Sequence, residues 1–199
     1  MFGLLAISDR RSLADGDLPG WLSRLGAAGV DAVQIREKDL DDCALWEIAR
    51  AARAMLPSTT RLLVNGRADI AFAAGADGVH LPSDGVPPGA LRRRFGPGLL
   101  LGVSTHTVDE VERARDAGAD YATFGPVWET PGKGTATGTG ALARAAASGL
   151  PVFALGGVTI DRFGEAAAAG AAGVAAIRLF QRLSDLSEAV AAARHWFPA

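Results

Sequence analysis

Short apolar segments alternate along the chain with longer segments of mixed polarity. Four of the apolar segments are continuous runs: GLLAIS at 3–8, RLLVN at 61–65, LLLGVS at 99–104 and PVFALGG at 151–157. Such runs are typical of parallel strands that are buried on both faces of a sheet. The segments that follow, such as 42–56 and 107–118, have the pattern of helices.

A second set of segments repeats one phrase, in which a helix end, a glycine and a short apolar strand follow one another. The phrase reads AAGVDAVQI from position 27, AAGADGVHL from 73, DAGADYATF from 116 and AAGAAGVAAI from 168. Glycine is favoured just past a helix because it adopts the left-handed backbone conformation at little cost. The two sets together predict eight strands that alternate with about eight helices.

This alternation predicts an α/β fold, a parallel sheet with right-handed crossovers. Eight units close such a sheet into a (β/α)8 TIM barrel. No linker divides the chain, so we expect a single domain over 1–199. An open doubly wound sheet is the structural alternative. The segment 129–140, rich in Gly and Thr, is expected to be a mobile loop.

Composition excludes several classes of partner. The chain has 20 Lys and Arg against 22 Asp and Glu, so it lacks the basic excess of a nucleic-acid surface. Its single cysteine has no partner for an internal disulfide. No apolar run approaches the roughly 18 residues of a membrane span, and the pattern of a signal peptide is missing. We therefore expect a cytoplasmic protein without a membrane partner.

Chemistry in a TIM barrel takes place at the carboxyl ends of the strands. In this chain polar residues and glycines gather at those positions. They are Asp9, Arg10, Gln34, Arg36, Lys38, Asn65, His80, Ser104, Thr105, His106, Gly156, Gly157 and Arg178, with Lys133 in the loop after the sixth strand.

Two anion sites are expected among these positions. Gly156 and Gly157 follow the seventh strand, where barrels often bind phosphate on backbone N–H groups, and Arg178 would add a cationic contact. A tight turn explains the glycine pair equally well. Arg36 and Lys38 supply a planar fork and a point charge suited to pyrophosphate oxygens. The alternative for this second pair is a solvated salt-bridge patch with the neighbouring Glu37 and Asp39.

Seven motifs together resemble the thiamine-phosphate synthase/TenI family of small barrels: SDR, VQIREK, LVNGRADIAFAAGADGVHLP, GVSTHT, GADYATFGPVWETPGK, ALGGV and GVAAI. The resemblance implies that Gln34, Arg36 and Lys38 bind a pyrimidine pyrophosphate, which Asn65 and Lys133 also meet. It implies that Gly156, Gly157 and Ile177 hold a thiazole phosphate. We add Ser104 and Thr130 to this set of binding residues.

The chain departs from the synthase pattern where that pattern holds magnesium. The synthase reads Asn-Asp-Arg where this chain has Gly66 in the middle position, and its second magnesium carboxylate falls on Gly85. Asp84 lies one residue early. Because Mg²⁺ prefers carboxylate oxygens, these replacements undermine a metal-assisted departure of pyrophosphate. Gly132 and Arg178 also replace a threonine and a serine of the family pattern.

The TenI branch of the family instead carries out a metal-free tautomerisation of a thiazole phosphate carboxylate, and the segments VNGRAD and WETPGK resemble it. The histidine associated with that reaction is Pro126 here. His106 and His80 are therefore the expected proton carriers, with Lys133 as a further catalytic group. In the alternative reading, His80 caps a strand and His106 neighbours a helix N-cap.

The main hypothesis is thus a TenI-like enzyme that acts on a small phosphorylated heterocycle and needs no metal or other cofactor. The first alternative is a thiamine-phosphate synthase, which joins hydroxymethylpyrimidine pyrophosphate to thiazole phosphate and uses Mg²⁺. The second alternative is a non-catalytic binder or regulator that keeps the phosphate sites. The sequence leaves a homo-oligomer open.

Overall fold

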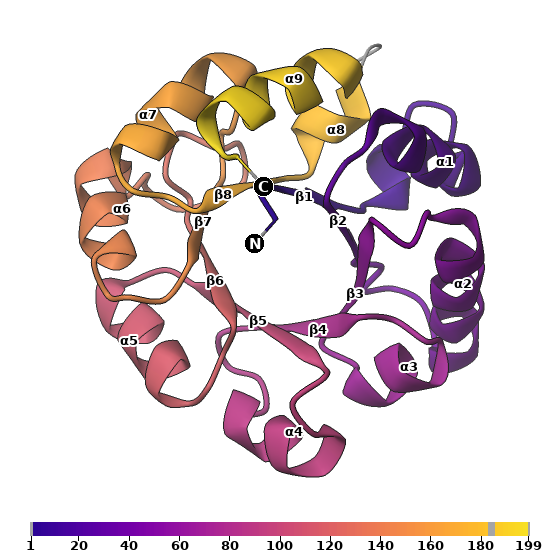
Figure 1. The fold of residues 1–199 in the computed structure, drawn as a ribbon. Helices are drawn as coiled ribbons and strands as arrows, with labels where there is room; N and C mark the ends of the chain where they lie inside the picture. The colour runs from indigo at the N-terminus through magenta and orange to yellow at the C-terminus, as the bar shows by residue number, and fades with distance from the viewer. Residues whose placement is uncertain (1, 183–185, 199) are drawn as a thin grey trace.

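Eight parallel strands form a closed barrel, in which β1 pairs with both β2 and β8 (Figure 1). The computed structural model describes residues 2–182 and 186–198. The strands are β1 Leu4–Ile7, β2 Ala32–Ile35, β3 Arg61–Asn65, β4 Gly78–Leu81, β5 Leu100–Thr105, β6 Tyr121–Phe124, β7 Val152–Leu155 and β8 Gly173–Ala176. The predicted TIM barrel is therefore confirmed, and the closing pair of β1 with β8 excludes the open sheet.

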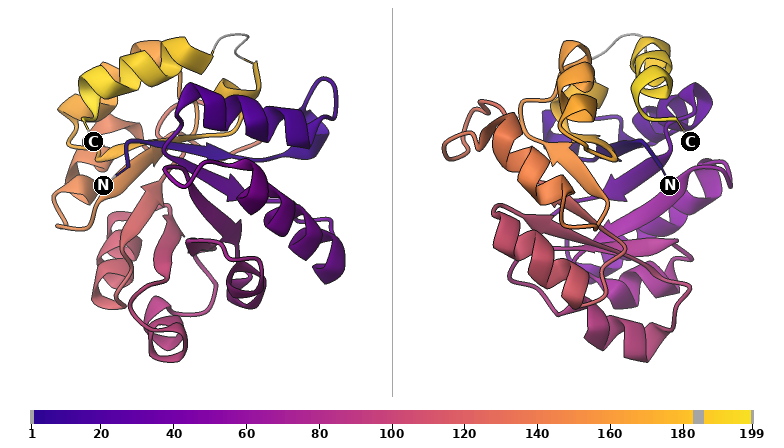
Figure 2. Two further views of the ribbon diagram at one scale, coloured as in Figure 1. Left: turned by 45° about the vertical axis from the view of Figure 1, so that its right-hand side comes forward. Right: turned by 60° about the vertical axis from the view of Figure 1, so that its left-hand side comes forward.

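The helices form a ring around the barrel, and both turned views in Figure 2 show them outside the strands. They are α1 Leu18–Ala28, α2 Asp42–Met55, α3 Ala68–Ala73, α4 Pro88–Phe95, α5 Val108–Asp116, α6 Gly138–Ala146, α7 Phe163–Ala168, α8 Arg178–Arg182 and α9 Leu186–Trp196, with 3-10 turns η1 Arg10–Ser12 and η2 Ile160–Arg162. In the described part of the chain, none of them has the length and hydropathy needed to cross a bilayer.

The repeated glycines have the conformation that the sequence predicts. Each ends a helical segment with a positive φ, namely 78° at Gly29, 69° at Gly75, 84° at Gly118 and 81° at Gly170. Side chains other than glycine rarely adopt this conformation. Each glycine therefore stops its helix and turns the chain into the next strand.

Aromatic side chains fill the interior of the barrel near the amino ends of the strands, which we call its lower part. Tyr121 and Phe153 are fully buried there, and the Phe2 ring packs 5.3 Å and 4.7 Å from their ring centres. The N-terminal segment lies at the centre of the ring of strands in Figure 1. A Cβ on Gly102 would lie 2.1 Å from Tyr121, so β5 needs a glycine opposite that ring. These contacts close the amino end of the barrel interior.

Three boundaries differ from the expectations. Strand β2 ends at Ile35, so Lys38 lies in a turn and not on the strand face that carries Gln34. Strand β4 continues to Leu81, so His80 lies inside the strand and does not cap it. Helix α6 begins at Gly138, which shortens the loop expected over 129–140.

Candidate active site at the carboxyl ends of the strands

A layer of polar side chains lies inside the barrel above the aromatic rings. Gln34 on β2 is only 1% exposed, and its Nε2 donates a hydrogen bond of 2.9 Å to Oδ1 of Asn65 on β3. Its Oε1 is buried and has no hydrogen-bond partner within the described residues. A buried amide oxygen without a donor is costly, so this atom is available to accept a hydrogen bond, and its contact with a ligand stays a prediction.

His80 on β4 connects the floor of this layer to its upper surface. The ring is 2% exposed; Nδ1 lies 2.9 Å from the Tyr121 hydroxyl and Nε2 lies 3.0 Å from Oγ of Ser104. A phenol is more acidic than an imidazole N–H, and the imidazole nitrogen is the better acceptor. The network therefore favours donation from Tyr121 to Nδ1, and from the Nε2 proton to Ser104. The hydroxyl proton of half-buried Ser104 is then free for a ligand.

Burial fixes the charge state of this chain of groups. Desolvation, with a smaller contribution from the nearby Arg36 charge, lowers the pKa of His80 to about 3. Burial also raises the pKa of Tyr121 above its ordinary value. Both groups are consequently neutral at physiological pH, and His80 does not take up a proton there. The ring instead accepts a hydrogen bond from Tyr121 at one nitrogen and donates one to Ser104 from the other.

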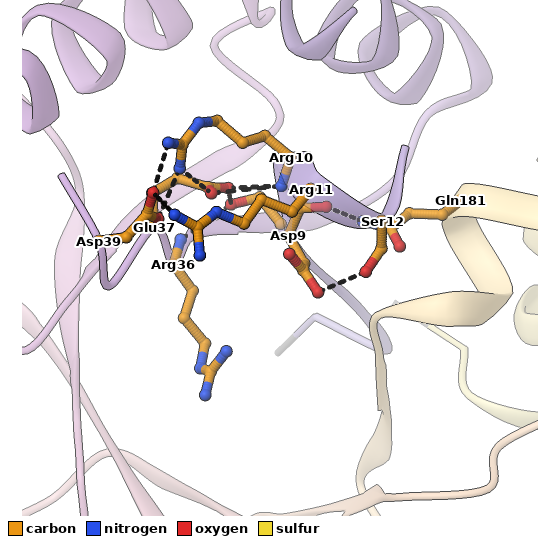
Figure 3. A network of polar contacts seen from close by, with 9 residues as sticks. Asp9, Arg10, Arg11, Ser12, Arg36, Glu37, Asp39 and Gln181 are labelled. Atoms are coloured by element: carbon orange, nitrogen blue, oxygen red, sulfur yellow. Dashed lines mark hydrogen bonds and ion pairs between the residues drawn. The ribbon is translucent and has the colours of Figure 1, made fainter. Parts of the chain in front are cut away.

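Arg36 follows β2 directly and is half-buried at the mouth of the barrel. Its guanidinium extends away from the neighbouring ion pairs (Figure 3) and has no hydrogen-bond or ion-pair partner within the described residues. Glu37 and Asp39 are instead bound by Arg10, and Asp39 also by Arg11. The alternative of a salt-bridge patch that neutralises Arg36 is therefore wrong.

Gly156 and Gly157 form a turn that packs closely against the loop after β6. Their φ angles are 90° and 65°, and a Cβ on either would lie 2.7 Å from Pro126 or Trp128. The close packing alone requires glycine at both positions. Within the described residues, the backbone N–H groups of Gly157 and Val158 have no hydrogen-bond acceptor. Two adjacent free donors suit an anion, and phosphate binding here stays a prediction.

The remaining predicted phosphate ligands surround the same turn. Thr130 lies beside Gly156, where its Oγ1 is 3.1 Å from the position of an added Cβ, and it donates to the carbonyl of Trp128. Ile177 is half-buried against the interior of the barrel. Arg178 is exposed and donates to the carbonyl of Pro131 at 3.3 Å, so in this structure its side chain lies along the loop after β6.

The two other predicted catalytic groups lie apart from the His80 network. Nδ1 of His106 lies 2.6 Å from the carbonyl of Gly125 and must donate to it, and its Nε2 has no partner among the described residues. Lys133 is exposed, and its ammonium has no partner in the part of the chain that the structure describes. Their catalytic roles stay predictions.

The residues at the family's magnesium positions do not fit a protein-bound Mg²⁺. Gly66 has φ of 70° and offers no side-chain oxygen. A Cβ on Gly85 would lie 2.9 Å from Pro82, so a carboxylate there would disturb the local turn. Asp84 is exposed, and the described residues hold no group of three or more His, Cys, Asp or Glu that could bind a metal.

Sequence reasoning missed three contributors to the site. Tyr121 and Thr123 point into the barrel beside His80, with Tyr121 at Nδ1 and Oγ1 of Thr123 3.4 Å from Nε2. Strict alternation along the sixth strand could have placed both on the inner face. Arg10 was noticed as a strand end, but no local pattern pairs it with Glu37 and Asp39, which lie 27 and 29 residues away.

Comparison with known proteins agrees with this fold and these motifs. The family model described as thiamine monophosphate synthase matches residues 4–180. A putative thiamine-phosphate synthase of Geobacter sulfurreducens is 46% identical over 181 residues, which cover 88% of this chain and 85% of the relative. The thiamine-phosphate synthase of Acidothermus cellulolyticus is 38% identical over 195 residues, which cover 94% of this chain and 90% of the relative.

A solved structure supports the same assignment. The thiamine phosphate pyrophosphorylase of Pyrococcus furiosus superposes with a TM-score of 0.87 at 27% identity, covering 98% of this chain and 96% of its own. The match thus extends over the whole barrel and includes all of the strands that carry the site. The chain belongs to the thiamine monophosphate synthase family, whose work is thiamine biosynthesis.

Proposed function

We propose that the chain is a thiamine-phosphate synthase, which joins hydroxymethylpyrimidine pyrophosphate to thiazole phosphate and releases pyrophosphate. The observation that carries the proposal is that two separate groups at one barrel mouth, a pair of cations and a pair of backbone donors, have no partner among the described residues. Arg36 and Lys38 lie after β2, and the N–H groups of Gly157 and Val158, which have no acceptor in the described part of the chain, lie after β7. Two anionic substrates need two such features, and the names of the relatives favour this alternative over the TenI-like expectation.

Each feature has a role in this reaction. Arg36 and Lys38 bind the pyrophosphate and stabilise the negative charge that grows on it as it leaves. The backbone donors after β7 hold the phosphate of the second substrate. The unpaired Oε1 of Gln34 accepts a hydrogen bond from a donor on the heterocycle, and Ser104 donates to an acceptor on it.

A TenI-like tautomerase is the second candidate, and one observation favours it. Gly66 and Gly85 supply no carboxylate at the family's magnesium positions, which suits a reaction that needs no metal. In that reaction the free Nε2 of His106 or the hydroxyl of Ser104 carries the proton, and Lys133 stabilises the developing charge.

Two assays separate these candidates. If the proposal is correct, the purified protein forms thiamine phosphate from the two substrates when Mg²⁺ is supplied. Tautomerisation of the thiazole phosphate carboxylate in chelator-treated buffer, without any coupling, would replace the proposal by the second candidate. Binding of both phosphorylated compounds with neither reaction would identify the non-catalytic binder.

Arg36→Ala and Lys38→Ala test the pyrophosphate site directly. Each removes a charge at the rim and no part of the core, so we expect binding of inorganic pyrophosphate to weaken by about tenfold or more. The thermal unfolding midpoint should stay close to that of the wild type. A large fall in the midpoint with unchanged affinity would show that these side chains are structural.

A further inference from the structure

We propose that Arg10 is a positioning residue, which binds Glu37 and Asp39 and thereby keeps Arg36 and Lys38 available to an anion. The inference rests on the proposed function, because it takes Arg36 and Lys38 as the pyrophosphate site. Arg10 lies after β1, and its side chain binds the two carboxylates and not the ligand.

The segment after β2 has no net charge of its own. Arg36, Glu37, Lys38 and Asp39 alternate in sign along four consecutive positions. Carboxylates so close to the two cations would attract them and repel an incoming pyrophosphate. An anion site at this segment therefore needs another group that neutralises the acids.

Arg10 supplies that group in a two-sided geometry. Its Nη1 and Nη2 bind the two oxygens of Asp39 at 2.6 and 2.5 Å, and Nη1 also lies 3.1 Å from Oε2 of Glu37. The fork geometry matches a carboxylate, which a lysine could not bind in this way. Arg11 adds one contact of 2.8 Å to Asp39 but none to Glu37 among the described interactions.

The network holds Glu37 inside the protein, while Asp39 stays at the surface. The Glu37 side chain is only 2% exposed, and it accepts hydrogen bonds from the Ser8 hydroxyl at 2.6 Å and from the Arg10 backbone N–H at 3.1 Å. Ser8 Oγ in turn accepts from the backbone N–H of Arg36 at 2.9 Å. Figure 3 shows Arg36 extending away from these groups. The carboxylates thus lie on one side of the chain and the free guanidinium on the other.

The ion pair with Asp39 persists over the physiological pH range. Hydrogen bonds from Arg10 lower the pKa of the Asp39 carboxyl to about 2. Asp39 consequently remains charged, and its neutralisation depends on Arg10 and not on protonation. With both arginines counted, the network turns a neutral segment into one with an excess of two positive charges.

The test is calorimetric titration with inorganic pyrophosphate in the presence of a chelator. Arg10→Ala exposes both acids to the site, and we expect its dissociation constant to rise about tenfold. Adding Asp39→Asn to that variant should bring the constant back to within about threefold of the wild type. Asp39→Asn alone should tighten binding, because it removes one negative charge and leaves Arg10 in place.

The direction in which Asp39→Asn changes pyrophosphate affinity separates this electrostatic role from a purely structural one, in which the network only stabilises the loop. If the network only braces the loop, the single variant weakens binding, and the inference fails. It also fails if Arg10→Ala leaves affinity unchanged or if the double variant shows no recovery. Should Arg10→Ala not fold, the Asp39→Asn result still decides the matter, since that side chain lies at the surface.

Two further variants complete the design. Arg194→Ala is a matched control, because Arg194 is paired with Asp31 at 2.6 Å near the amino ends of the strands and its loss changes the net charge equally. We expect no change in pyrophosphate affinity. Arg36→Ala separates the two proposals: if it leaves pyrophosphate binding intact, the proposed site is wrong. If Arg36→Ala abolishes binding and Arg10→Ala does not, only the role of Arg10 is wrong.

Discussion

At the scale of single residues, the His80 imidazole determines which way the Ser104 hydroxyl can present its proton. Tyr121 lies below the ring and Ser104 above it, and both contacts have ordinary hydrogen-bond lengths. The sequence marked His80 as a polar strand end, but its partners come from β5 and β6. Its role depends on those partners, which only the closed barrel brings together.

The tautomer of His80 is the first prediction. Donation from Tyr121 leaves Nδ1 without a proton, so nitrogen NMR of labelled protein should show a neutral ring protonated at Nε2 near neutral pH. Tyr121→Phe removes this donor and leaves no acceptor for a proton on Nδ1, so we expect the ring to stay protonated at Nε2 and the Nδ1 resonance to move to that of a nitrogen without a hydrogen-bond donor. A wild-type ring protonated at Nδ1 would contradict the assignment. His195, which is exposed, serves as the internal reference.

The pH dependence of stability is the second prediction. Burial lowers the pKa of His80 to about 3, below the ordinary value of 6.5, so the unfolded chain binds this proton more readily than the folded one. The stabilising contribution is complete above the unfolded pKa and is lost as the pH falls below it. The loss amounts to about 2 kcal/mol near pH 5.

Denaturant unfolding at a series of pH values measures this effect. In the wild type the free energy of unfolding should fall as the pH is lowered from about 7 to about 5. His80→Gln should have a lower free energy of unfolding at every pH in the series, but that free energy should depend much less on pH than in the wild type. An identical slope in the two proteins would mean that another group governs the acid sensitivity.

At the scale of elements, the apolar runs and glycine stops predicted the strands well because each strand is buried on both faces. The ends of the elements were predicted less well, because the apolar pattern is weakest there. Strand β2 stops at Ile35, although Gln34, Arg36 and Lys38 alternate as if it continued. Alternation describes direction only while the chain stays extended, so it placed Arg36 correctly at the mouth and could not place Lys38 in its turn.

The pairing of β5 with β6 gives a third prediction. Gly102 faces the Tyr121 ring, and a Cβ there would lie 2.1 Å from it. Gly102→Ala should therefore displace the ring and destabilise the fold by about 1–3 kcal/mol, the usual cost of overpacking. Because Tyr121 holds His80, we also expect weaker binding of substrate.

A matched substitution controls for the loss of glycine itself. A Cβ on Gly98 meets no atom within 4 Å, and its φ lies outside the left-handed region. Gly98→Ala should leave the free energy of unfolding within about 0.5 kcal/mol of the wild type. If both variants behave alike, the Tyr121 ring adapts easily and the inner layer is less tightly packed than the structure indicates.

At the scale of the whole molecule, the closed barrel brings together residues that no local pattern connects. Arg10 meets Glu37 across two strands, and the turn at Gly156 meets the loop after β6. The sequence could predict which residues lie at the mouth, because strand ends are recognisable from the pattern of apolar runs and glycines. It could not predict which charges remain unpaired, because ion pairing depends on side-chain directions in the closed ring.

Those unpaired charges lead to the last prediction, which concerns Mg²⁺ without substrate. Gly66 and Gly85 offer no side-chain oxygen, and Asp84 alone would leave a mostly hydrated ion. Arg36 and Lys38 repel a free cation at the same rim, while Asp39 is held by Arg10. Calorimetric titration of the substrate-free protein should therefore show no tight binding of Mg²⁺. Micromolar affinity for Mg²⁺ that disappears in Asp84→Asn would instead show that the loop after β4 forms a new metal site. The electrostatic potential at the rim would then have to be less positive than Arg36 and Lys38 imply.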